Sequence, residues 1–235
     1  MRPGFLNYED DFFFVHGLHG LPIRGMLEEM RCFLDDNPQE ILIVDFNHFH
    51  GFHDGDNVFS THERLTNMIH QVFAGLLLSR DEINADVISS ISLHDIWFRK
   101  RQVLLGYKDQ GVCSKNPEFW FSKDLIFSPW HNTDSLASLD HSLNNLIKTR
   151  DTKRFNVFQG ILTARKSTVL SNPNSTLRET LVTKCNAGLK KWLHHFINQR
   201  EHQSESSIIN IVMCDFICED DLVPLILKLN LCNKV

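Results

Sequence analysis

The chain has 235 residues, with 24 Lys and Arg against 29 Asp and Glu, and its formal net charge at pH 7 is −5. This acidic balance excludes a protein whose main task is to cover nucleic-acid phosphates, because that task needs a basic face. With 42% hydrophobic and 23% charged residues the composition is globular, and no apolar run approaches the ~20 residues of a membrane span. We expect one soluble domain.

The start of the chain and its cysteines indicate a reducing compartment. The residues before Phe12 do not form the apolar segment of a secretory signal. The six cysteines are scattered through a chain long enough to fold without disulfides, and Cys214 and Cys218 have the wrong spacing for a redox pair. We therefore expect reduced thiols, no metal held by cysteine and a cytoplasmic location.

Short apolar runs alternate with amphipathic stretches along the chain. The runs over 12–16, 40–46, 102–107, 155–162 and 208–216 predict strands, and the stretches over 23–34, 62–77, 136–147, from 174 onward and over 221–229 predict helices. This repeated order predicts a parallel α/β fold. Alternation alone does not separate a barrel from an open, doubly wound sheet, although no glycine-rich phosphate loop follows any strand.

The longest predicted helix carries two further signals. Thr176 and Glu179, just after Pro173, form a capping-box pattern at its start. Its apolar residues recur on one helical face, which predicts a buried stripe. The stripe consists of Leu177, Leu181, Cys185, Leu189, Trp192 and Phe196.

Polar residues gather where predicted strands end, and parallel α/β folds build their binding sites at that edge. His16 closes the first strand, where it can donate a proton near neutral pH or simply be hydrogen-bonded. The polar cluster over 45–56, with His48 and His50, favours a strand end running into a solvated loop over a metal site. Asp215 lies within an apolar strand pattern, so we expect it to pair, either with a catalytic histidine that it orients or with a structural arginine.

Five segments resemble one family in their order and spacing. They are FFFVHG at 12–17, EILIVDFNHF at 40–49, SPWHNT at 128–133, ILTARKSTV at 161–169 and NIVMCDFICEDDLVPLILKLN at 210–230. Together they are similar to the phosphatidylinositol-specific phospholipase C X-domain-containing proteins. This resemblance implies a TIM-barrel-like (β/α) fold with its active site at the carboxyl ends of the strands.

The resemblance also implies a reaction. In this family the inositol 2-hydroxyl attacks the neighbouring phosphorus and expels diacylglycerol, which gives a cyclic inositol phosphate. One histidine is the general base, a second protonates the leaving alkoxide, an arginine stabilises the phosphoryl charge and an aspartate orients the base. His16 matches the second, acid histidine, and Asp215 matches the aspartate.

The chain departs from the family pattern before His16. The family's base histidine lies in a G-S-H-D-like segment and its arginine in a G-x-R-Y-x-D-L-R-like segment, and both precede the equivalent of His16. Here His16 is the first histidine, and Arg2 lies in a loop-like sequence, so neither role is carried over. We expect residues 1–235 to form a single X-box domain whose first two strands are missing, with 12–16 and 208–216 as edge strands of an open barrel.

The resemblance implies an inositol phospholipid as substrate and contact with a membrane surface, which the acidic net charge makes transient. We expect no metal, since the segments that hold calcium in animal relatives have no counterpart here. The alternative function is a catalytically inactive form that binds lipid or a partner. Four residues at or just beyond strand ends are predicted to bind substrate, with rim or packing roles as the alternative: Asn47, Tyr107, Trp130 and Arg165.

Overall fold

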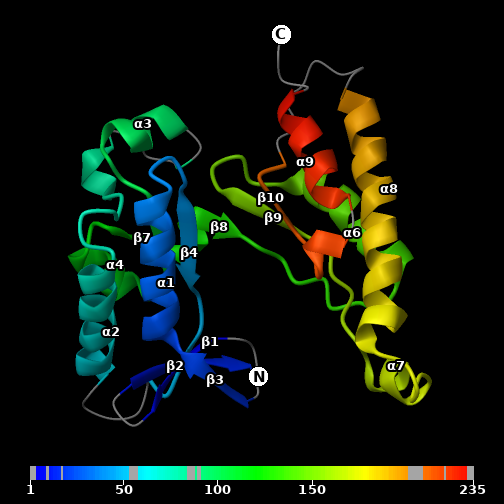
Figure 1. Ribbon diagram of the computed structural model, residues 1–235, viewed down its shortest axis with the longest axis horizontal. Coiled ribbons are helices and arrows are strands. Elements are labelled where there is room, and N and C mark those ends of the chain that lie inside the picture. The colour runs from blue at the N-terminus through cyan, green and yellow to red at the C-terminus, as the bar shows by residue number, and fades with distance from the viewer. Residues whose placement is uncertain are drawn as a thin grey trace. The chain divides into compact units, whose positions relative to one another are not determined.

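The computed structural model describes residues 4–8, 11–16, 18–52, 58–83, 88, 91–200, 209–219 and 221–231. They fall into two compact units, Met1–Ile126 and Phe127–Val235 (Figure 1). Each unit has its own hydrophobic core. The assignment of 1–235 to a single domain stays a prediction.

The first unit contains two sheets. One has the strand order β3-β2-β1-β5, in which β2 (Asp11–His16) pairs antiparallel with β1 (Gly4–Tyr8) and β3 (Leu18–Pro22). β1 pairs in parallel with β5 (Phe49–His50). The other sheet is parallel throughout and has the order β4-β6-β7, formed by Leu42–Phe46, Val103–Tyr107 and Phe119–Phe121.

The helices of this unit bury the apolar residues that recur at helical spacing. α1 (Ile23–Asp36) buries Ile23, Leu27 and Leu34, and it contacts α2 (Val58–Val72). β6 is buried along its whole length, as expected for a strand covered on both faces of a parallel sheet. The shorter elements are α3 (Leu93–Phe98), α4 (Gln110–Lys115), α5 (Ser122–Leu125) and a 3₁₀ turn at Arg80–Glu82.

The second unit is built around a sheet of order β10-β9-β8, formed by Ile211–Met213, Phe155–Gln159 and Ile126–Phe127. β9 and β10 are parallel. α6 (Leu136–Thr149), α8 (Thr183–Arg200) and α9 (Leu222–Leu231) supply most of the core, and α7 (Lys166–Leu170) is a short helix after β9. No described helix has both the length and the apolar character that crossing a bilayer requires.

A mixed α/β fold with parallel sheets is confirmed. Two predictions are wrong: that 12–16 is an edge strand, and that the strands at the start of the chain are parallel. β2 is not an edge strand, because β1 pairs with it on one side and β3 on the other. The first three strands are antiparallel, since the links between them are too short for the crossover that parallel neighbours need. The described strands form three separate sheets, and no closed barrel is found among them.

The predicted capping box is confirmed, but the helix that follows begins irregularly. The Thr176 N–H donates to Glu179 Oε2 at 2.9 Å, and the Glu179 N–H donates to Thr176 Oγ1 at 3.2 Å. Residues Arg178–Val182 then form a π-helical turn before α8. This wider turn rotates Leu177 off the buried stripe, so its predicted burial is wrong and it is 53% exposed. The other five stripe residues are buried.

The buried thiols should react far more slowly than the exposed ones. Cys113 and Cys185 lie in the two cores, where burial raises the pKa of each thiol to about 11. At neutral pH these thiols are therefore almost fully protonated and poorly nucleophilic. Maleimide labelling followed by peptide mass spectrometry should modify the exposed Cys32 and Cys218 first. Equal labelling rates at all four thiols would contradict this expectation.

Candidate active site

Asp45, Asn47 and His48 form a hydrogen-bonded chain at the carboxyl end of β4. Asn47 Nδ2 lies 3.0 Å from Asp45 Oδ2, and Asn47 Oδ1 lies 2.8 Å from His48 Nδ1. A carboxylate oxygen only accepts hydrogen bonds, so the Asn47 amide group faces Asp45 and its carbonyl oxygen faces His48. That oxygen also only accepts, so Nδ1 of His48 carries the proton. In the neutral ring Nε2 then holds the lone pair, which is the tautomer of a general base.

Asp45 is held tightly against the neighbouring strand. Its Oδ1 is buried and has no hydrogen-bond partner among the described residues. The strand register places Asp45 opposite Gly106 of β6, and a Cβ on Gly106 would lie 2.7 Å from Asp45 Oδ1. Because glycine has no Cβ, position 106 leaves the space that the Asp45 carboxylate occupies.

Replacing Gly106 by Ala should displace the Asp45 carboxylate and lower the free energy of unfolding by about 1–3 kcal/mol, the usual cost of overpacking. Leu125 Cδ2 would lie 3.2 Å from the new methyl group, so a second neighbour resists the shift. Urea unfolding measures the loss. Gly25→Ala in α1 is the matched control, because open space surrounds that position, and equal losses for the two variants would contradict the packing argument.

Tyr107, at the carboxyl end of β6, is fully buried. Its hydroxyl oxygen lies 2.7 Å from His62 Nδ1. Its ring stacks on those of Phe46 and Phe119. Burial raises the pKa of the Tyr107 hydroxyl above its ordinary value, so the phenol stays protonated. These contacts support the packing role for Tyr107 over the substrate-binding role.

His16 closes β2, and its side chain is exposed. No hydrogen bond of its ring is found in the described part of the chain. The register of β1 with both β2 and β5 places His48 at the same end of this sheet as His16. Two strand spacings of about 4.8 Å separate β2 from β5.

In the second unit, beyond the carboxyl end of β9, Trp130 forms a hydrogen bond and Arg165 forms an ion pair. Trp130 Nε1 donates to Thr163 Oγ1 at 3.1 Å. Asp134 Oδ1 lies 3.2 Å from Arg165 Nε, and Asp134 Oδ2 accepts a hydrogen bond from Thr168 Oγ1 at 3.1 Å. The Arg165 side chain is 62% exposed and Trp130 is 55% exposed, so both are accessible to a ligand.

The predicted burial of Asp215 in a strand is wrong. β10 ends at Met213, and Asp215 lies exposed in the bend that follows. Its backbone carbonyl accepts a hydrogen bond from Asn186 Nδ2 at 2.9 Å, and Phe216 after it has a φ of 52°. The chain thus turns out of the sheet before the apolar neighbours can bury the carboxylate. No ion pair of Asp215 with an arginine is found among the described residues.

Within each unit, most of the predicted site residues contact polar groups that are not themselves predicted site residues. Within the described part of each unit, no hydrogen bond joins two of the six residues that were predicted to form the site. Asp45, the first residue of the predicted polar cluster, contacts Asn47, and Asp134, which was not predicted, contacts Arg165. His131 was also missed: its Nε2 is buried without a partner among the described residues, and burial lowers its pKa below the ordinary value. The six are His16, Asn47 and Tyr107 in the first unit, and Trp130, Arg165 and Asp215 in the second.

The polar cluster over 45–56 is described only in part, because His53, Asp54 and Asp56 lie outside the described residues. Among the residues that the structure does describe, no group of three or more His, Cys, Asp or Glu side chains could hold a metal ion.

Comparison with known proteins shows which proteins the chain resembles. No protein-family model matches the chain. Its curated homologues, which match nearly all of the chain, are PI-PLC X domain-containing proteins.

The relatives include three mammalian proteins. The chain is 30% identical over 223 residues to PI-PLC X domain-containing protein 3 of Mus musculus and of Homo sapiens. It is 29% identical over 230 residues to PI-PLC X domain-containing protein 2 of Mus musculus. These matches cover 94% and 97% of the chain but 64% and 62% of the relatives, so the chain spans less than two thirds of their length.

Proposed function

We propose that the chain is a phosphoric diester hydrolase that cleaves inositol phospholipid to diacylglycerol and a cyclic inositol phosphate. The observation that carries this proposal is similarity to PI-PLC X domain-containing proteins over 94% of the chain. The proposed fold is a TIM-barrel-like (β/α) barrel with its site at the carboxyl edge of the parallel strands. Within the first unit, the polar groups that follow β4 support that location.

His16 is the proposed general acid. It is exposed at the end of β2, where an imidazolium can protonate the leaving diacylglycerol alkoxide as the phosphorus–oxygen bond breaks. Asp215 matches the family's orienting carboxylate and is proposed to act beside the substrate, since Nδ1 of the proposed base His48 is held by Asn47. Its exposed position after β10 supports a group that meets a partner or a substrate rather than a buried structural ion pair.

His48 is the proposed general base. The inositol 2-hydroxyl would give its proton to Nε2 as its oxygen forms the new bond to phosphorus. Asn47 holds the ring through Nδ1, and the Asp45 carboxylate behind it favours the imidazolium that forms. This hydrogen-bonded chain supports the assignment, which replaces the base histidine that the family pattern places before His16.

Arg165 and Trp130 are proposed to bind substrate. The Arg165 guanidinium can pair with phosphoryl oxygens, and the exposed Trp130 ring suits the boundary between a headgroup and a lipid surface. Asn47 contributes through His48. The proposed reaction uses no metal, and the proposed contact with the membrane is peripheral and transient, from the cytoplasm.

Phosphorus NMR of the chain with phosphatidylinositol vesicles tests the proposal. We expect a cyclic inositol phosphate signal that persists in EDTA and disappears in His16→Ala, because the leaving alkoxide loses its acid. His94→Ala, at an exposed histidine of α3, is the matched control and should retain the signal. No signal above buffer from the folded chain would overturn the hydrolase proposal. Co-sedimentation with the same vesicles would then test the inactive, lipid-binding alternative.

A further inference from the structure

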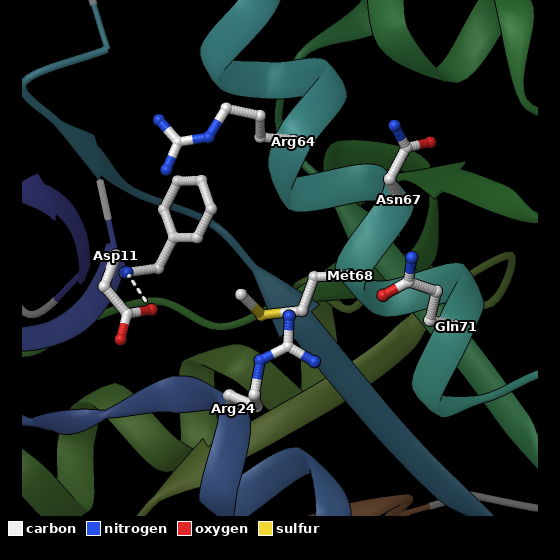
Figure 2. A pocket seen from close by; sticks show the side chains of 7 residues that line it. Asp11, Arg24, Arg64, Asn67, Met68 and Gln71 are labelled. Carbon is white, nitrogen blue, oxygen red and sulfur yellow. Dashed lines mark hydrogen bonds between the residues drawn. The ribbon is translucent and has the colours of Figure 1, made fainter.

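Two cavities of the molecule differ sharply in size. In the first unit, a pocket of about 440 Å³ lies between α1, α2 and β2, and Arg24, Asn67 and Gln71 line it from the two helices (Figure 2). In the second unit, a cavity of about 10 Å³ lies between the segments that follow β9 and β10 and the start of α8. This second volume is close to the roughly 10–15 Å³ that a single water molecule requires, so a larger ligand does not fit.

The side chain of Asn186, on α8, lines the small cavity and is 2% exposed. Its Nδ2 donates to the backbone carbonyl of Asp215 at 2.9 Å, and a carbonyl oxygen only accepts, so this contact fixes which way the amide is turned. The amide oxygen, Oδ1, is buried and has no hydrogen-bond partner among the described residues. A buried polar atom without a partner costs free energy, and ordered water is the common way in which proteins satisfy one.

The backbone is irregular on two sides of this cavity. The π-helical turn Arg178–Val182 is wider than an α-helical turn, and Val182 at its end lines the cavity. On the other side, Phe216 has a φ of 52° and turns the chain away from the direction of β10, which leaves Asp215 at the cavity wall. These two departures from regular geometry keep the helix and the strand from closing on each other at this point.

We infer that this cavity binds one water molecule, and that Asn186 and this water together hold the bend that carries Asp215. The water would donate one hydrogen bond to Asn186 Oδ1. It would donate a second to the carbonyl of Gly160 in the cavity wall, which accepts from the Cys185 thiol at 3.2 Å and has a second lone pair. One asparagine thus ties the start of α8 to the segments that follow both strands, directly after β10 and through the water after β9.

The inference goes beyond the proposed hydrolase function. The Asn186 amide contacts the backbone of Asp215, whereas the reaction would use its exposed side chain. A chain with no hydrolase activity would still bind this water, and an active chain could lack it. The two proposals can therefore fail separately.

Nuclear Overhauser spectroscopy of the full chain tests for the water. We expect cross-peaks between water and the N–H groups that line the cavity, including those of the Asn186 side chain. Val182→Ile adds a methyl group to a wall of the cavity and should abolish these cross-peaks while the Asn186 amide stays in place. Asn186→Leu has a similar volume without the acceptor, and it should abolish the cross-peaks of the remaining N–H groups.

A second measurement tests whether Asn186 holds the bend. In Asn186→Leu the backbone order parameter of Phe216 should fall from the value of about 0.85 that is usual for a rigid backbone toward the range below about 0.6 that marks a flexible one. In Val182→Ile the fall should be smaller, because the direct bond to Asp215 remains. An unchanged order parameter in Asn186→Leu would contradict the holding role.

Two controls separate a bound water from general hydration and from the loss of a buried amide. The side-chain amides of Asn67 and Gln71 line the large pocket, where water exchanges rapidly, and should give no such cross-peaks. Asn156→Leu is the matched control, because Asn156 is also 2% exposed and its Nδ2 also donates to backbone carbonyls. This variant should keep the cross-peaks, and circular dichroism checks that each variant folds. No cross-peak in the folded native chain, or cross-peaks that survive both Val182→Ile and Asn186→Leu, would overturn the inference.

Discussion

Replacing Tyr107 by Phe should lower the free energy of unfolding by about 1–3 kcal/mol, and replacing it by Ala should lower it by about 3–5 kcal/mol. The first change leaves Nδ1 of His62, a residue that is 5% exposed, without the hydroxyl partner it has at 2.7 Å. The second also opens a cavity beside Phe46 and Phe119. Urea unfolding of the purified chain measures both values.

The same variants decide between packing and substrate contact at Tyr107. Phe98→Ala removes a ring that is 77% exposed and is the matched control, with an expected change within about 0.5 kcal/mol. Unchanged stability of Tyr107→Phe, together with a raised KM for phosphatidylinositol, would contradict the packing role and favour substrate contact.

Replacing His48 by Ala should lower the rate of phosphatidylinositol hydrolysis by about 10²–10⁴-fold, the usual contribution of a general base. Added imidazole should restore part of the rate, because it can supply the lost base from solution. Initial rates against lipid concentration measure the effect, and His94→Ala is again the matched control. Full activity of a folded His48→Ala variant would exclude this histidine as the base.

Asn47→Ala separates a positioning role from the predicted substrate-binding role. If Asn47 acts by fixing the tautomer of His48, kcat falls and KM is unchanged, because the ring loses the oxygen that accepts its Nδ1 proton. If Asn47 binds the headgroup instead, KM rises. Asp45→Asn should follow the first pattern, since its contact with His48 runs through Asn47.

The long elements of the fold could be predicted because they repeat a period enough times to be recognised. α1 buries apolar residues at regular helical spacing, and β6 is a continuous apolar run. Residues 108–133, for which no element was predicted, contain α4, β7, α5 and β8, which are too short to show a period. The residues of β3 do not alternate between buried and exposed either, because all of them are exposed.

The positions of Asn47 and Arg165 after strand ends could be predicted, but their contacts could not. Parallel strands expose their carboxyl ends, so Asn47 and Arg165 could be placed at a sheet edge from the sequence. Asp134 could not be assigned to Arg165, because the two are distant in sequence and the fold brings them together. The errors at Leu177 and Asp215 share a cause, since each residue directly precedes an irregular backbone: the π-helical turn from Arg178 and the left-handed Phe216.

The parallel pairing of β9 with β10 has a consequence for the order of folding. The Asn156 N–H donates to the side chain of Asn210, a residue 54 positions further along the chain. α7 and α8 lie between these strands, so a long loop closes before the first ladder bond can form. The hairpins that join β1, β2 and β3 close over a few residues and can form within microseconds. During synthesis, the N-terminal hairpins can thus be in place early, while the sheet of the second unit waits until β10 has left the ribosome.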